Sequence, residues 1–253
     1  MTAAHSLLVA PFATASAKQA TSAERMKPSV SNGAVGTLLL LRRMSLDGDV
    51  LGHAVMPGAA VGYLYAGPSP NWLTLGGLAS GLAVAALAGA VTRRGARDDA
   101  GLVAFYLVAL SVGVLLVAWR GSNVDLVRVL FGTVLAIDRQ ALWQIAAASS
   151  VILLAVAALY RPLAVDAFDP AFLHAVGGWA GYRAAFSVLV VLALVASFQA
   201  FGTLLAVGPM LLPAAAARCW SLGAAASIAL ATAFGLASSV CGLLISYLSL
   251  IHI

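Results

Sequence analysis

The chain has 253 residues, of which 62% are hydrophobic and 9% are charged, and its formal net charge is +5. An ordinary soluble domain carries roughly 25% charged residues, so this composition excludes that class. It predicts instead an all-α, polytopic transmembrane helical bundle, in which each span satisfies its own backbone hydrogen bonds. The arginines lie mainly between apolar runs, which indicates topology signals and no nucleic-acid partner.

The two ends of the chain differ from the rest. Residues 1–32 are polar, with no charged start to an apolar core, so we expect a disordered or non-native leader and no cleaved signal peptide. The first apolar run, 33–41, has nine residues, whereas a helix needs about 20 to cross the hydrocarbon. We therefore expect a transmembrane domain at 33–247 whose first span is incomplete, followed by a tail at 248–253 that reads as adapter-derived.

The apolar runs predict about seven full spans, a truncated first span and a short re-entrant or interfacial helix over residues 124–137. The full spans are expected at residues 49–66, 72–91, 101–119, 141–160, 184–199, 203–217 and 223–247. Arg42 and Arg43, and the arginines at 93, 94 and 97, are expected in the cytoplasm, with residues 160–183 on the same side.

Small residues recur at a spacing of four, at Gly58 and Gly62 and at Gly77 and Gly81. This spacing lets helix backbones approach closely in lipid. Gly67, Pro68 and the proline at 70 predict a turn between two spans.

The most informative polar residues are Asp49 and His53, which are four apart and so share one helix face, one turn apart. Pro57 has no N–H and leaves the His53 carbonyl without its helical partner. Imidazole with carboxylate suits zinc or manganese, and other helices or water must complete the site. The alternative is structural: Asp49 caps the helix and His53 hydrogen-bonds a neighbouring helix.

Two other polar clusters have a structural and a functional interpretation. Asp125 and Arg128 are three apart, which favours an interfacial ion pair. In residues 165–177, Asp169 can cap a short helix that begins at Pro170 and ends at Gly177. An apolar face that includes Phe172 would suit docking into a groove of a partner, although the helix could also rest on the membrane surface.

The chain has no phosphate-binding loop, because Lys18 precedes Gln19 and Lys27 precedes Pro28, whereas the loop needs Gly-Lys followed by Ser or Thr. We therefore predict a transport subunit that is not an enzyme. If transport is driven by ATP, another polypeptide hydrolyses it.

Five segments in order resemble the permease subunits of zinc, manganese and iron ABC importers. They are LRRMSL (41–46), GDVLGHAVMPG (48–58), DLVRVLFG (125–132), FDPAFLHAVG (168–177) and GPMLLPAAAAR (208–218). Members of this family usually carry Ser where Gly52 stands and often His where Arg128 stands.

The resemblance implies roles and partners. It implies that Asp49 and His53 lie on the path of the metal, and that Phe168, Asp169, Pro170, Phe172 and Gly177 belong to the helix that contacts the ATPase. It also implies a permease homodimer, a cytoplasmic ATP-binding subunit, an extracytoplasmic metal-binding protein and a multi-pass location in the bacterial inner (plasma) membrane. Zn²⁺, Mn²⁺ or Fe²⁺ is then the transported ion, and no cofactor is bound permanently. Family members continue through a further loop and helix, so the resemblance implies that the permease domain at 33–247 is incomplete at both ends. Such a chain is not expected to transport, and its last span should show uncovered apolar surface.

Two alternatives remain open from the sequence. A secondary transporter would need no ATPase and would normally show paired repeats with broken helices, of which the sequence shows no clear sign. The chain could also be a non-functional fragment of such a permease, or an interaction subunit.

Overall fold

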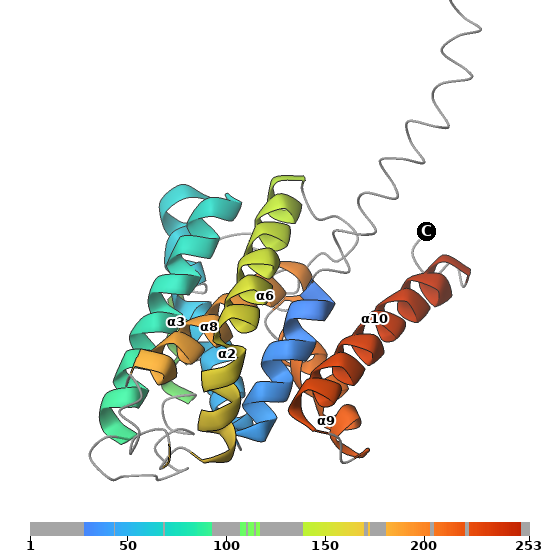
Figure 1. Cartoon of the computed structure of the whole chain (residues 1–253). Helices are drawn as coiled ribbons and strands as arrows, with labels where there is room; N and C mark the ends of the chain where they lie inside the picture. The colour runs from blue at the N-terminus through green and yellow to red at the C-terminus, as the bar shows by residue number, and fades with distance from the viewer. Residues whose placement is uncertain are drawn as a thin grey trace, which may run out of the picture.

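The computed structural model describes residues 28–42, 44–67, 69–92, 107–109, 111–113, 115–116, 139–169, 172, 181–202, 205–220 and 223–248. Within these residues the chain is helical, with turns between helices and no strand. The helices are Pro28–Leu41, α2 (Ser45–Ala66), α3 (Pro70–Thr92), α6 (Arg139–Phe168), α8 (Gly181–Phe201), α9 (Gly208–Arg218) and α10 (Ala224–Leu248). They pack side by side (Figure 1), so the predicted all-α bundle is confirmed for this part of the chain.

The described part of the first helix runs from Pro28, so it includes residues 28–32 of the segment expected to be a polar leader. The polar residues that follow are buried because they find partners on other helices. The Asn32 amide donates to the Ser197 hydroxyl of α8 at 2.8 Å, and the hydroxyls of Ser29 and Ser239 of α10 lie 2.8 Å apart.

Helices α2 and α3 form a tight hairpin around the predicted turn. α2 ends at Gly67, which has φ of 67°, a conformation that favours glycine, and whose N–H donates to the Tyr63 carbonyl at 2.8 Å. The backbones then cross closely at glycines: a Cβ at Gly58 would collide with the Gly76 carbonyl, and one at Gly62 with the Trp72 carbonyl. The close approach of helix backbones, predicted from the spacing of Gly58 and Gly62, is therefore confirmed.

Gly77 and Gly81 have a different role from the one their spacing indicated. Their missing Cβ atoms leave room for valine side chains, Val55 of α2 beside Gly77 and Val191 of α8 beside Gly81. It is Gly76 that brings the α3 backbone against α2.

Two helices differ in length from the sequence prediction. α6 continues past residue 160 to Phe168, with Pro162 inside it. The predicted span at 203–217 is wrong, because α8 ends at Gly202, whose φ is 77°, and the next helix, α9, has only 11 residues. At about 1.5 Å per residue, α9 is too short to cross about 30 Å of hydrocarbon.

Length and composition make three described helical segments long and apolar enough to cross a membrane: Leu142–Phe168, Ala184–Phe201 and Ala224–Gly242. Pro28–Leu41 and Asn71–Leu87 are shorter apolar helices. The chain is thus a multi-pass membrane protein, while the expected number of about seven spans is not established. The predicted helices at 101–119 and 124–137 lie wholly or largely outside the described residues.

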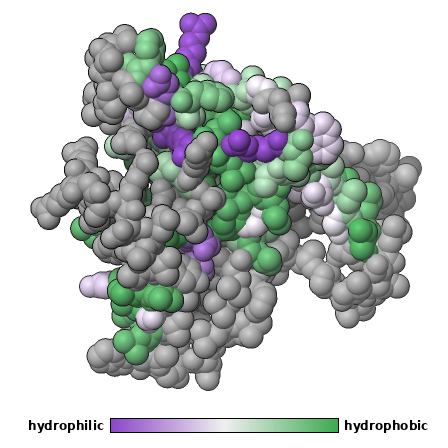
Figure 2. Space-filling view, turned by 90° about the horizontal axis from the view of Figure 1, so that it is seen from below, coloured by the Kyte–Doolittle hydropathy of each residue, from purple (hydrophilic) through white to green (hydrophobic). Residues whose placement is uncertain are grey.

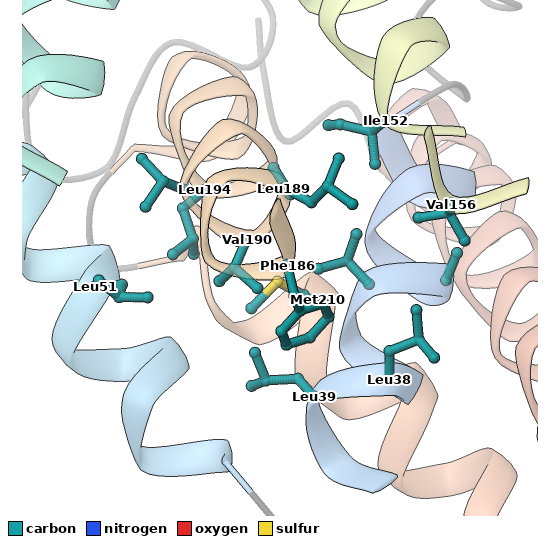
Figure 3. Close-up of a cluster of buried hydrophobic side chains, with 14 of the residues drawn as sticks. Leu38, Leu39, Leu51, Ile152, Val156, Phe186, Leu189, Val190, Leu194 and Met210 are labelled. Atoms are coloured by element: carbon teal, nitrogen blue, oxygen red, sulfur yellow. The ribbon is translucent and has the colours of Figure 1, made fainter. Parts of the chain in front are cut away.

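Helix α8 lies at the centre of the bundle and contacts α2, α3 and α6. Its buried residues Phe186, Val190 and Leu194 meet side chains from the first helix and from α6, α2 and α9 (Figure 3). This apolar cluster also contains Leu38, Leu39, Leu51, Ile152, Val156, Leu189 and Met210. Because lipid is as apolar as these side chains, close packing is what holds the helices together here.

One end of the bundle is joined by neutral polar side chains. Asn71 at the start of α3 accepts hydrogen bonds from Gln140, at 3.2 Å, and from Gln144, both at the start of α6. Thr74 donates to Gln144 at 3.2 Å and accepts a hydrogen bond from Gln199 near the end of α8. The starts of α3 and α6 and the end of α8 therefore share one end of the molecule, opposite the end at which α2 starts.

Helix α10 lies at the edge of the bundle (Figure 1) and packs on α9 and the first helix. Most of its apolar surface is uncovered, including the side chains of Val240, Leu244 and Ile245. The expected apolar surface of this last helix is therefore present.

Candidate metal path and coupling segment

Asp49 and His53 lie one turn apart on α2, as their spacing predicted. The His53 Nε2 is 3.8 Å from the Asp49 Oδ1. The imidazole is buried, with a side-chain exposure of 10%, while the carboxylate side chain is 51% exposed. The pair therefore combines a donor held inside the bundle with a donor that an approaching ion can reach.

Pro57 lies inside α2, one turn beyond His53. Because proline has no N–H, the His53 carbonyl lacks its usual helical partner. Next to His53, Gly52 allows close packing: a Cβ there would meet the Val207 Cγ2 at 2.8 Å and the Leu194 Cδ2 at 3.7 Å. The absence of a side chain at Gly52 thus lets the turn before α9 pack against the helix that carries the pair.

The two side chains are an incomplete ligand set. Among the described residues, no group of three or more His, Cys, Asp or Glu side chains could hold a metal ion. Imidazole and carboxylate are ligands that zinc, manganese and iron all accept. An ion passing this point would need further donors, such as water or a second protein chain.

The segment predicted to dock on an ATPase follows α6 directly. α6 ends at Phe168, and the Asp169 N–H still donates to the Val165 carbonyl at 2.8 Å. The Asp169 Oδ1 then accepts from the Phe172 N–H at 2.9 Å, which is the predicted capping interaction. Phe168 and Phe172 are exposed. Pro170, His174 and Gly177 lie outside the described residues, as do Asp125 and Arg128.

The sequence did not predict a buried ion pair at this end of the bundle. The Arg42 Nη2, just after the first helix, lies 2.7 Å from the Asp166 Oδ2 of α6, and the two side chains are 5% and 6% exposed. The Arg42 guanidinium carbon is also 3.9 Å from the ring centre of Phe186. The pair links positions far apart in the sequence, which no local pattern could reveal.

This contact bears on topology. It places the end of the first helix and the end of α6 at the same end of the bundle, as predicted when both were assigned to the cytoplasmic side. Viewed from that end, hydrophilic residues gather near the middle, among hydrophobic ones (Figure 2).

Comparison with known proteins agrees with this arrangement. The sequence pattern of the ABC 3 transport family matches residues 19–251. The chain belongs to this family. It is 30% identical to the manganese transport system membrane protein MntC of Listeria monocytogenes over 221 residues, which is 87% of this chain and 78% of that protein. It is 31% identical over 217 residues to the manganese import system permease protein ScaB of Streptococcus parasanguinis, covering 85% of this chain and 76% of that protein.

A solved structure, PsaBC from Streptococcus pneumoniae in complex with Fab, has the same fold. The TM-score is 0.78 at 29% sequence identity, and the match covers 90% of this chain and 82% of that chain. The resemblance drawn from five sequence segments is therefore confirmed: this ABC 3 family chain is a membrane permease of a metal-ion ABC importer.

Proposed function

We propose that this permease imports Mn²⁺ and that the ion passes Asp49 and His53 on α2. The observation that carries this proposal is the pair itself, one partly exposed carboxylate and one buried imidazole a turn apart beside a helix-interior proline. Ionisable groups at membrane depth usually face a transport path, because burying them without a function is costly.

Manganese is favoured over zinc and iron by two considerations. Relatives about equally similar over most of this chain are named for manganese transport or import. Oxygen donors suit manganese, whereas structural zinc sites favour imidazole and thiolate ligands in a closed tetrahedron. The described cysteines cannot supply such thiolates beside Asp49 and His53, because Cys219 lies at the end of α9 and Cys241 lies in α10, and both are exposed.

The two side chains bind the ion at different depths in the bundle. The His53 imidazole, one turn farther from the Arg42 end, holds the ion from within the bundle through a neutral nitrogen. The half-exposed Asp49 carboxylate then receives the ion and releases it to water on the cytoplasmic side. Because this set is incomplete, we propose that a second copy of the permease brings its own α2 to the same path, as a homodimer.

The remaining partners follow from the same proposal. A cytoplasmic ATP-binding subunit docks on Phe168, Asp169, Pro170, Phe172 and Gly177, and an extracytoplasmic protein delivers the metal. The location is the plasma membrane of a bacterium, with the Arg42 end inside the cell.

The test is reconstitution of the permease in vesicles with its ATP-binding subunit and metal-binding protein, followed by measurement of trapped Mn²⁺, Zn²⁺ and Fe²⁺. We expect accumulation of Mn²⁺ that requires ATP and stops when the ATP-binding subunit cannot hydrolyse it. Faster accumulation of Zn²⁺ than of Mn²⁺ would contradict the proposed cargo. Uptake without ATP would indicate a secondary transporter.

Replacing Phe172 with Asp tests the docking role. The side chain is exposed after the Asp169 cap, and a charge in an apolar contact must be desolvated on docking. We expect metal-stimulated ATP hydrolysis by the complex to fall about tenfold, equivalent to ~1.4 kcal/mol of docking free energy, while Mn²⁺ binding is unchanged. Phe172→Leu, which keeps an apolar side chain, should remain close to the wild type. Normal hydrolysis by Phe172→Asp would remove this residue from the ATPase contact.

A further inference from the structure

The buried pair of Arg42 and Asp166 connects the two functional parts of the molecule. Charges that leave water are tolerated only when they are paired, and apolar side chains would fill the same space at lower cost. An ion pair differs from apolar packing in one respect: it fixes the distance and direction between two particular groups. The geometry at this position is tight, with 2.7 Å between the charged groups and the Phe186 ring against the guanidinium.

Arg42 is connected through a short turn to α2, the helix that carries Asp49 and His53. Met44 lies between Arg42 and the start of α2 at Ser45. This turn is closed by two hydrogen bonds, from the Met44 N–H to the Leu39 carbonyl at 3.1 Å and from the Gly48 N–H to the Met44 carbonyl at 3.3 Å. A displacement of Arg42 must therefore displace the first turn of α2, which leads directly to Asp49.

On the other side, Asp166 is attached to the segment proposed to contact the ATPase. It lies in the last turn of α6, and the backbone hydrogen bond from Asp169 to Val165 and the side-chain cap on Phe172 continue from that turn. Pro162 precedes it by one turn and leaves the Ala158 carbonyl without its helical partner. Prolines inside helices are where helices bend, so the end of α6 can tilt at this point.

We infer that Arg42, Asp166 and Phe186 form the mechanical link by which a movement of the coupling segment reaches α2. The inference rests on the proposed function, because it takes residues 168–177 as the ATPase contact and Asp49 and His53 as the metal path. The end of α6 tilts at Pro162, Asp166 moves with it, and Arg42 transmits the movement to the start of α2. Arg42 and Asp166 are positioning residues, since neither lies on the metal pair.

The test replaces the pair with apolar residues of similar size in the assembled complex, Arg42→Met with Asp166→Leu, so that neither charge is left buried alone. We expect the complex to assemble and to hydrolyse ATP, but the number of Mn²⁺ ions moved per ATP should fall by about twofold to 30-fold, the range for residues that carry coupling between sites. Asp166→Glu keeps the charge and should retain more than about half of the wild-type ratio.

Two further variants, compared with the double variant, test the inference. Arg161→Gln removes an exposed arginine from the same helix and should leave the ratio unchanged. Phe186→Leu removes only the ring beside the guanidinium and should lower the ratio less than the double replacement. If the double variant does not assemble, the Phe186→Leu variant becomes the test. A wild-type number of Mn²⁺ ions per ATP in Phe186→Leu would then overturn the inference. A wild-type ratio in the assembled double variant would do the same.

A second measurement separates this inference from the proposed cargo. ATP binding to the wild-type complex should change hydrogen exchange in the backbone of residues 44–57, and the double variant should lose that response. If the wild-type complex moves no Mn²⁺ but shows this pair-dependent response, the cargo assignment fails and the link stands. If the complex pumps Mn²⁺ and the response is identical in the double variant, the link fails and the function stands.

Discussion

Asp49→Ala and His53→Ala should each reduce ATP-driven Mn²⁺ accumulation in reconstituted vesicles by about 100-fold. The reason is that the pair supplies two of the few donors on the path, and loss of even an outer partner of a metal ligand costs about 10–100-fold. Asp49→Asn removes only the charge, and His53→Gln removes the imidazole while keeping a polar side chain of similar size. These two variants should transport as poorly as the alanine variants.

The matched control for this prediction is Tyr65→Phe, which changes an exposed side chain on the same helix. It should transport normally. Size-exclusion profiles and ATPase binding should be the same for all variants, because the polar replacements leave no large cavity around His53. Normal uptake by both Asp49→Asn and His53→Gln would leave the pair with a packing role only, because α2 starts at Ser45 and Asp49 does not cap it.

Gly58→Val should destabilise the permease more than any other single change of a glycine in α2. A Cβ at this position meets the Gly76 carbonyl and the Ser80 hydroxyl. The first of these is backbone, which cannot rotate away, so α3 would have to move. Overpacking of a well-filled interior costs about 1–3 kcal/mol, and we expect the upper part of that range. Thermal unfolding in detergent, followed by tryptophan fluorescence, measures the effect.

Gly242→Val is the control, because no described residue lies within 4 Å of a Cβ at that position of α10. It should unfold at the temperature of the wild type. Gly58→Ala should lie between the two, since it introduces the collision without the two extra methyl groups. Equal unfolding temperatures for Gly58→Val and Gly242→Val would mean that α2 and α3 do not meet through Gly58 and Gly76.

Local patterns predicted several turns and helices and the placement of Asp49 and His53 one turn apart, because each depends on residues close together in the chain. The Gly67 turn needs only a residue that tolerates positive φ, and the Asp169 cap reaches only three residues ahead. The spacing of Asp49 and His53 was sufficient to place them one turn apart. Local patterns failed where a competing effect was stronger. The span predicted at 141–160 continues through Pro162 to Phe168, and the apolar run at 203–217 follows a glycine with positive φ at 202 and overlaps only the 11-residue helix α9.

The sequence by itself determined that this is a helical membrane protein, where its main turns lie and which permease family it belongs to. Only the tertiary structure decided that Arg42 pairs with Asp166, that Gly76 brings the α3 backbone against the α2 backbone while Gly77 receives a valine side chain, and that Asn32 is buried against Ser197. The physical reason is that such contacts depend on which helix faces lie together after packing. In an apolar sequence many faces look alike, and the choice is made by small residues and a few polar groups that must find partners far along the chain.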